Sequence, residues 1–244
     1  MENFIVSARK YRPASFDTVV GQLAITSTLR NAIVNHQLAQ AYLFTGPRGV
    51  GKTTCARIFA KTINCLNLQP NAEPCNECES CKAFNAGRSL NIHELDAASN
   101  NSVDDIRGLV EQVRILPQVG KYSVYIIDEV HMLTNDAFNA ILKTLEEPPA
   151  HVIFIFATTA PHKLPMTVLS RCQRFDFRRI RDEEIKEHLL YIAQQEQIEI
   201  AADAAALIAR KADGGMRDAV SLLDQCAAAS EGPISTDTVT AILG

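Results

Sequence analysis

A glycine-rich stretch that ends in lysine and threonine has the residue types and the spacing of a phosphate-binding loop. Residues 46–53, Gly-Pro-Arg-Gly-Val-Gly-Lys-Thr, fit the pattern G-x-x-x-x-G-K-[ST]. An apolar run at 42–44 predicts a short buried strand before the loop, and residues 55–60 predict an amphipathic helix after it. This strand–loop–helix context separates the pattern from an ordinary glycine-rich turn. The stretch therefore predicts a site for a nucleoside triphosphate.

The predicted loop can hold a triphosphate through its backbone and through two side chains. Glycines let consecutive backbone N–H groups turn toward one anion, and the N-terminus of the following helix adds its partial positive charge. Lys52 can reach the β- and γ-phosphates, and the Thr53 hydroxyl is placed to bind Mg²⁺. The residues expected around the phosphates are Gly46, Arg48, Gly49, Val50, Gly51, Lys52, Thr53 and Thr54.

A second motif joins a buried strand to two acidic residues. Residues 123–130, Ser-Val-Tyr-Ile-Ile-Asp-Glu-Val, contain the continuous apolar run expected of a strand covered on both faces of a parallel sheet. After a phosphate-binding loop, Asp128 is the expected partner of Mg²⁺, directly or through water, and Glu129 is placed to polarise the attacking water. The alternative is a strand that ends in acids at a solvated edge, and the loop upstream favours the catalytic interpretation.

Four of the seven cysteines have the spacing of one metal site. They follow the pattern C-x9-C-x2-C-x2-C and are Cys65, Cys75, Cys78 and Cys81. Four thiolates in a tetrahedron suit a closed, structural Zn²⁺ site, with Zn–S distances of about 2.3 Å. Free thiols and an iron–sulfur cluster are the alternatives, but ferredoxin-type runs place the fourth cysteine downstream, whereas here it lies upstream. The remaining cysteines, expected to be small packing residues, are Cys55, Cys172 and Cys226.

Strands and helices that could position these residues alternate up to about residue 178. Further strands are predicted at 90–95, 152–157 and 174–177, and a helix is predicted at 23–35. Thr159 follows the strand at 152–157, where a polar side chain can touch the γ-phosphate or orient the attacking water. After Arg178, four helical patterns follow without a buried strand run. We therefore expect an α/β domain that is followed along the chain by a small helical domain.

Composition and charge argue against several classes of protein. The chain has 244 residues, of which 47% are hydrophobic and 21% charged, as in ordinary globular proteins. No apolar run approaches the roughly 20 residues that a membrane-spanning helix needs, and residues 1–6 lack the basic start and apolar core of a signal peptide. We therefore expect a cytoplasmic protein without membrane contact. The net charge of −4 argues against a uniformly basic nucleic-acid binder.

The order of these motifs resembles that of the AAA+ ATPases and, more closely, that of the tau/gamma subunits of bacterial DNA polymerase III clamp loaders. The matching segments cover nearly the whole chain: 9–13, 19–22, 46–53, the four-cysteine insert, 96–99, 128–131, 142–149, 157–159, 169–172 and 215–219. The cysteine insert and the Ser-Arg-Cys triplet at 170–172 are the most specific of them.

The resemblance implies an α/β fold of the AAA+ P-loop NTPase type. In it, a five-stranded parallel sheet with a zinc-binding insert is followed by a small all-α lid domain, and the nucleotide lies between them. The nucleotide-binding domain would span 1–178, with the insert at 65–81, and the lid would span 179–244. A collar domain, which holds the assemblies of this family together, is expected beyond residue 244.

The resemblance also changes the interpretation of the N-terminus. Residues 8–13 are basic and end in proline, so that periodicity alone predicts an extended, solvated arm. In the family, this arm and the pair Val19-Val20 would line the adenine pocket. The arm residues that we assign to this pocket are Ala8 and Arg12.

The resemblance assigns three more residues to family roles. Thr159 would be the sensor at its strand tip, and Arg217 would reach the γ-phosphate from the lid. Arg171 would act on ATP that is held by the neighbouring subunit. The alternative for Arg171 is a salt-bridged surface arginine.

The implied activity is ATP hydrolysis within the DNA polymerase III holoenzyme, coupled to opening a sliding clamp and releasing it on primed DNA. The implied cofactors are ATP, magnesium and zinc. The implied partners are the delta and delta-prime subunits, further tau/gamma copies, the clamp and primer–template DNA. A non-catalytic scaffold subunit such as delta-prime and an AAA+ DNA helicase such as a branch-migration motor are the alternatives. The complete set of phosphate-loop and acidic residues argues against the first, and the cysteine insert argues against the second.

Overall fold

Five parallel strands form one sheet in the order β2-β3-β4-β1-β5. They are β1 (Ala41–Thr45), β2 (Ile92–Asp96), β3 (Ser123–Asp128), β4 (Val152–Thr158) and β5 (Gln173–Asp176). All neighbouring strands run parallel, so the carboxyl ends of the strands meet at one edge. The structure is a computed structural model that describes residues 6–230 and 232–244. It confirms the predicted five-stranded parallel sheet.

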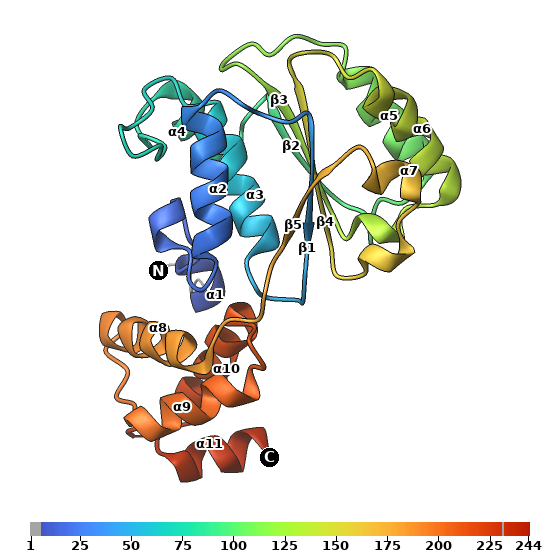
Figure 1. Cartoon of the computed structure of the whole chain (residues 1–244). Coiled ribbons are helices and arrows are strands. Elements are labelled where there is room, and N and C mark those ends of the chain that lie inside the picture. The colour runs from blue at the N-terminus through green and yellow to red at the C-terminus, as the bar shows by residue number, and fades with distance from the viewer. Residues whose placement is uncertain (1–5, 231) are drawn as a thin grey trace.

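Helices cover both faces of the sheet (Figure 1). On one side lie α2 (Leu23–Val34), α3 (Lys52–Ile63) and α4 (Glu79–Asn85). On the other lie α5 (Val103–Gln112), α6 (Asn135–Glu146) and α7 (Met166–Leu169). Every residue of β1 and of β4 is buried, because these strands are covered on both faces.

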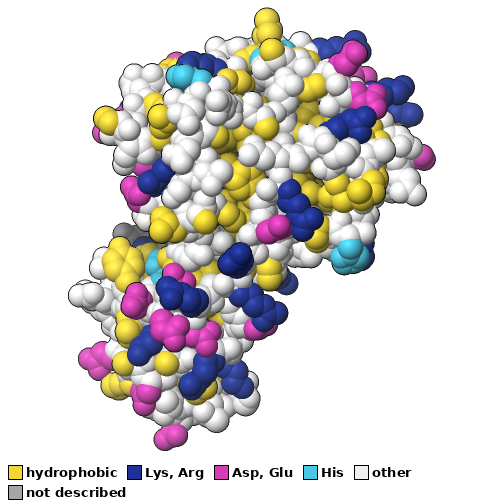
Figure 2. All heavy atoms as spheres, in the orientation of Figure 1, with side chains coloured by type: hydrophobic (Ala, Val, Ile, Leu, Met, Phe, Trp, Pro, Cys, Tyr) yellow, Lys and Arg dark blue, Asp and Glu magenta, His cyan; other side chains and the backbone are white. Residues whose placement is uncertain are grey.

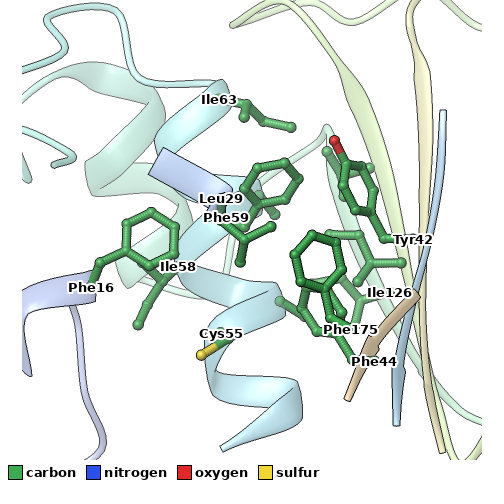
Figure 3. Packing of buried hydrophobic residues seen from close by; sticks show 14 of the residues in the cluster. Phe16, Leu29, Tyr42, Phe44, Cys55, Ile58, Phe59, Ile63, Ile126 and Phe175 are labelled. Atoms are coloured by element: carbon green, nitrogen blue, oxygen red, sulfur yellow. The ribbon is translucent and has the colours of Figure 1, made fainter. Parts of the chain in front are cut away.

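Aromatic side chains fill the core between the sheet and α3 (Figure 3). The ring of Phe59 of α3 lies 4.9 Å from that of Tyr42 of β1. The ring of Phe44 lies 5.6 Å from that of Phe175 of β5. Edge-to-face pairs of this kind add to the free energy gained by burying the rings. The core thereby holds α3 against β1. Because the phosphate-binding loop joins these two elements, the core also positions both ends of the loop.

Four helices follow the last strand and share a hydrophobic core of their own. They are α8 (Asp182–Gln195), α9 (Ala202–Lys211), α10 (Met216–Ala229) and α11 (Thr236–Leu243). In Figure 1 they lie beyond the carboxyl ends of the strands, next to the loop between β1 and α3. The predicted helical part is confirmed, and we propose Arg178, which lies between β5 and α8, as the boundary between two domains.

The N-terminal segment is not the extended arm that the sequence predicted. Ser7–Lys10 form one helical turn, α1, whose first backbone N–H donates to Asp224 Oδ2 of α10 at 2.9 Å. Periodicity along the chain carries no signal for a contact between residues so far apart. A 3₁₀ turn at Phe16–Thr18 follows. Residues 1–5, on which the expected absence of a signal peptide depends, lie outside the described residues.

The surface of the helical part is mixed in charge. Lys and Arg side chains alternate with Asp and Glu over the face shown in Figure 2. Among the helices of the described residues, none combines the length and the hydrophobicity that crossing a membrane requires.

Candidate nucleotide site and cysteine cluster

A cleft of about 910 Å³ lies where the phosphate-binding loop, the ends of β2 and β3, the N-terminal segment, α8 and α10 converge. Most of the site residues expected from the sequence line it: Ala8, Arg12, Val19, Val20, Arg48, Gly49, Val50, Gly51, Lys52, Thr53, Thr54, Asp128, Glu129 and Arg217. The cleft is not lined by the other predicted site residues, which are Gly46, Thr159, Arg171 and the four cysteines. The volume suits a ligand with a base, a sugar and three phosphates.

The shape of the loop requires glycine at two positions. Gly46 has a φ of 142°, and a Cβ atom there would lie 2.4 Å from the carbonyl oxygen of Phe177. Gly49 has a φ of 75°, and a Cβ atom there would lie 3.2 Å from both Asp218 Oδ2 and the Cα atom of Gly215. Positive φ and close approach both disfavour any larger residue. Gly46 therefore shapes the loop from behind, although it does not line the cleft.

Lys52 lies at the start of α3 with its ammonium group inside the loop. Its Nζ donates to the carbonyl oxygens of Gly46 and Pro47 at 2.8 and 2.6 Å. Burial lowers the pKa of Lys52, and the carboxylates of Glu129 and Asp128 oppose that shift. Phosphate oxygens entering the loop would add negative charge beside this buried cation, so the site favours a polyanion.

Thr53 and Asp128 meet at the base of the cleft. The Thr53 hydroxyl donates to Asp128 Oδ2 at 2.6 Å, and the backbone N–H of Glu129 donates to Asp128 Oδ1 at 2.9 Å. Asp96, which also lines the cleft, pairs with Asp128 across the β2–β3 register. Hydroxyl and carboxylate oxygens beside phosphate oxygens are the ligands that Mg²⁺ prefers. The residues present therefore fit a magnesium ion at this point.

Glu129 has a strained backbone and a carboxylate that is bound by the residue that follows β4. Its φ of 47° lies in the left-handed region, which non-glycine residues rarely adopt and which is typical of functional sites. Glu129 Oε2 accepts hydrogen bonds from the hydroxyl and the backbone N–H of Thr159 at 3.0 and 3.2 Å. Nδ1 of His131 lies 3.3 Å from the same oxygen. Thr159 thus contacts the proposed catalytic base, and sequence reasoning did not identify His131 as a further contact.

Two arginines contact the phosphate-binding loop and the first turn of α3. Arg12 Nε donates to Thr54 Oγ1 at 3.1 Å, and the backbone N–H of Arg217 donates to the carbonyl oxygen of Gly49 at 3.4 Å. Desolvation in the cleft and then the positive charge of Arg57 lower the pKa of the Arg12 guanidinium, and Arg217 adds to this effect. A bound anion would relieve this mutual repulsion. The N-terminal segment and α10 thus both bring positive charge to the phosphate side.

Gln22 is a structural member of the site that sequence reasoning missed. Its side chain is buried, and its amide nitrogen donates to the carbonyl oxygens of Arg178 at 2.7 Å and Val50 at 3.3 Å. Its amide oxygen accepts from the backbone N–H of Arg178 at 3.4 Å. One side chain thus links the loop to the segment that leads into the helical part. A single glutamine at the start of a helix has no periodic signal that could have revealed this.

Arg171 lies outside the cleft and pairs on its own surface. Its guanidinium donates to the carbonyl oxygen of Thr167 at 2.7 Å and to Glu146 Oε1 at 3.1 Å. The side chain remains one-third exposed. Within this chain, Arg171 therefore makes the surface ion pair that was the alternative to a role at a neighbouring site, and it does not approach its own cleft.

The four predicted zinc ligands come together beside α3 and α4. The sulfur atoms of Cys65, Cys75, Cys78 and Cys81 all lie within 4.8 Å of one another. Tetrahedral ligands at the Zn–S distance would be about 3.8 Å apart, so the cluster fits the ion with small adjustments. Backbone N–H groups of Cys75, Cys78 and Cys81 donate to sulfur atoms of the cluster at 3.3 to 3.5 Å. Such bonds stabilise thiolates that ligate a metal.

The other three cysteines are packing residues, as expected. Cys55 and Cys226 are buried, and Cys172 is half-buried against the second core of the sheet. Burial raises the pKa of the Cys55 and Cys172 thiols to about 12, and it also raises that of Cys226. These thiols are therefore protonated and unreactive at neutral pH.

Two family profiles match the chain in succession. One, described as DNA polymerase III, delta subunit, matches residues 21–181. The other, described as DNA polymerase III clamp loader subunit, ATPase lid domain, matches residues 184–232. The first covers the sheet and the helices on its faces, and the second covers α8 to α10.

Curated relatives match nearly the whole chain. DNA polymerase III subunit tau of Bacillus subtilis (strain 168) is 52% identical over 236 residues, which are 97% of this chain and 42% of the relative. DNA polymerase III subunit tau of Escherichia coli (strain K12) is 46% identical over 99% of this chain and 38% of the relative. The chain thus spans about two fifths of the length of these relatives. DNA polymerase III subunit gamma of Buchnera aphidicola subsp. Acyrthosiphon pisum (strain APS) is 39% identical over 99% of this chain and 67% of the relative.

Solved structures agree on the fold. The Holliday junction branch migration motor RuvB of Thermotoga maritima superposes with a TM-score of 0.69 over 96% of this chain and 72% of its own, at 22% identity. At that identity the likeness concerns the fold alone. The two profiles and the relatives carry the assignment further: the chain belongs to the tau/gamma family of DNA polymerase III clamp-loader subunits.

Proposed function

We propose that this chain is the ATP-binding and ATP-hydrolysing part of a DNA polymerase III clamp loader, which loads a sliding clamp onto primed DNA during replication. The contact between Thr53 and Asp128 is the observation that carries the proposal, because it joins the phosphate-binding loop to the acidic strand end in one cleft. Lys52 and Glu129 line the same cleft. Phosphoryl transfer to water needs a cation for the phosphates, two ligands for magnesium and a base for the attacking water, and these four residues would supply them.

The residues of the chain divide the work of hydrolysis. Lys52 and the N–H groups of the loop would hold the β- and γ-phosphates. Glu129 would orient the attacking water and accept its proton. A Mg²⁺ ion held by Thr53 and Asp128 would neutralise negative charge on the phosphate oxygens. Thr159 would act from its strand tip as a sensor, and Arg217 would add positive charge from the helical side of the cleft.

The N-terminal segment and the pair Val19-Val20 would enclose the adenine base. Val19 and Val20 supply apolar surface, and Ala8 lines the cleft with them. Arg12, with its contact to Thr54, would lie between the base and the phosphates. Apolar walls with a few polar groups are typical of nucleotide pockets.

Two other functions are less well supported. A non-catalytic scaffold such as delta-prime would not need Lys52, Thr53, Asp128 and Glu129 together in one cleft. A DNA helicase of the branch-migration type shares the fold, but that likeness at 22% identity says nothing of the reaction. The identity of 46 to 52% to tau subunits favours the clamp loader.

Several partners follow from this function. The delta and delta-prime subunits, further tau/gamma copies, the sliding clamp and primer–template DNA would assemble with the complete protein, which would work in the cytoplasm. In such an assembly, we propose that Arg171 exchanges its surface pair with Glu146 for the γ-phosphate held by a neighbouring subunit. Hydrolysis would then depend on assembly.

We also propose that the cysteine cluster holds one structural zinc ion. Four thiolates leave no position open for a substrate or a water molecule. The ion would therefore stabilise the insert and take no part in the reaction.

Changing Lys52 to Ala should abolish ATP binding, because the loop loses the side-chain cation that faces the phosphates. Titration calorimetry with Mg–ATP checks this, and Lys82→Ala, which removes an exposed lysine of α4, serves as the matched control. Equal affinity in wild type and Lys52→Ala would contradict the assignment of the loop.

Changing Glu129 to Gln should preserve ATP affinity and lower turnover about 10²- to 10⁴-fold, because the amide keeps the size of the side chain but cannot accept the proton. Phosphate release by the assembled loader measures this, with the exposed Glu111→Gln as control. Undiminished turnover would remove Glu129 from the proposed role.

Purified protein should contain about one zinc per chain and be colourless. Elemental analysis of wild type, Cys78→Ser and Cys172→Ser separates the cluster from the packing cysteines: only Cys78→Ser should lose the ion. Stoichiometric iron, or a visible absorption band, would overturn the zinc assignment.

Changing Arg171 to Ala should leave the ATP affinity of the isolated chain unchanged and slow the assembled, DNA-stimulated loader by about 10³-fold. Arg174→Ala, which removes a half-exposed arginine of β5, should have little effect. Assemblies that mix wild-type and variant subunits should show the defect at the adjacent site. Loss of ATP affinity in the isolated variant would contradict a role between subunits.

A further inference from the structure

Glu73 of the cysteine insert contacts the segment that leads into the predicted base pocket. It is 6% exposed, although glutamate is rarely buried without a partner. Its Oε2 accepts from the backbone N–H of Phe16 at 3.0 Å, and its Oε1 accepts from that of Asp17 at 2.9 Å. Both donors belong to the 3₁₀ turn Phe16–Thr18, whose first N–H groups have no partner within the turn. The insert thus caps a turn that lies more than fifty residues upstream.

Arg30 of α2 balances the charge of this buried carboxylate. Its guanidinium pairs with both Glu73 and Asp17, and it lies 5.7 Å from the centre of the Phe16 ring. Hydrogen bonds to charged groups are roughly twice as strong as those between neutral ones. The turn is therefore held by three elements: the insert, α2 and, through the Phe16 ring, α3, where Phe16 lies beside Ile58 (Figure 3).

Lys61 makes a second link between the insert and this segment. It lies on α3, the helix that begins with the phosphate-binding loop, and is only 2% exposed. Its Nζ donates to the carbonyl oxygen of Ala14 at 2.9 Å and to Asn76 Oδ1 at 2.7 Å. One ammonium group therefore joins the N-terminal segment to the insert, at a point between two of the predicted metal ligands.

These contacts end just before the residues that line the cleft. Ala14, Phe16 and Asp17 are held from the insert side, and Val19 and Val20 follow within three residues. A chain so short cannot absorb a shift of the turn without moving Val19 and Val20. We propose that Glu73 is a positioning residue for the nucleotide's base: through the turn at Phe16–Thr18, the cysteine insert sets the apolar wall against which adenine packs.

This inference rests on the proposed ATP site, and its test separates the base from the phosphates. Inorganic tripolyphosphate occupies the phosphate-binding loop without a base. In Glu73→Gln, an amide replaces the charge and one of the two acceptor oxygens, at the same size. The affinity of the variant for Mg–ATP should fall about tenfold, whereas its affinity for tripolyphosphate should not change. Glu77→Gln, an exposed position in the same insert, should leave both affinities unchanged.

Calorimetry on the full chain, with zinc content and thermal unfolding measured for each variant, gives the result. Unchanged ATP affinity in Glu73→Gln, or an equal loss for both ligands, overturns the positioning role. If wild type binds neither ligand, the proposed function itself fails. If Glu73→Gln does not fold, Arg30→Lys keeps a positive charge but loses the fork that spans two carboxylates. The Arg30→Lys variant should then lose affinity for Mg–ATP, by less than about tenfold, and keep its affinity for tripolyphosphate. If Arg30→Lys binds Mg–ATP as tightly as wild type does, the proposal is overturned.

Discussion

The hydrogen bond between the Thr53 hydroxyl and the Asp128 carboxylate joins the first turn of α3 to the end of β3. Thr53 follows β1 and Asp128 ends β3, and β4 lies between these strands. Because all strands run the same way, their carboxyl ends share one edge, and the first turn of α3 meets the end of β3 there. A shift of β3 by one residue would turn Asp128 to the other face. The buried register of the strands therefore determines the geometry of the candidate site.

The helical part depends on the same loop. The backbone N–H of Arg217 donates to Gly49, and Gln22 bonds both Val50 and Arg178, which leads into the helices. Apolar contacts add to these bonds, because Ala8, Tyr11 and Val20 pack against the hydrophobic core of the four helices. A ligand in the cleft would thus contact both the helical part and the N-terminal residues that pack against it. Such an arrangement suits a lid whose position responds to the ligand.

Local patterns were sufficient for the strands, the phosphate-binding loop and the cysteine cluster. Buried parallel strands are apolar along their length, as 124–127 and 152–157 are, so the run itself indicates the element. The loop at 46–53 lies within one strand–helix connection, and its glycines meet a requirement of local backbone geometry. The cysteines are close in sequence, so their meeting needs no knowledge of the rest of the fold. Family resemblance, and not periodicity, was needed for the roles assigned to Ala8, Arg171 and Arg217.

The sequence by itself therefore determined the class of fold, the order of its elements and the chemistry of the groups at the strand ends. Tertiary structure decided which distant groups meet. It turned the N-terminal arm into a helical turn against α10, and it placed Glu129 within reach of Thr159 and His131. It also buried Glu73 against the turn at Phe16–Thr18. The physical reason is that periodicity reports which face of an element is buried, whereas a hydrogen bond between residues far apart in the chain depends on how whole elements pack.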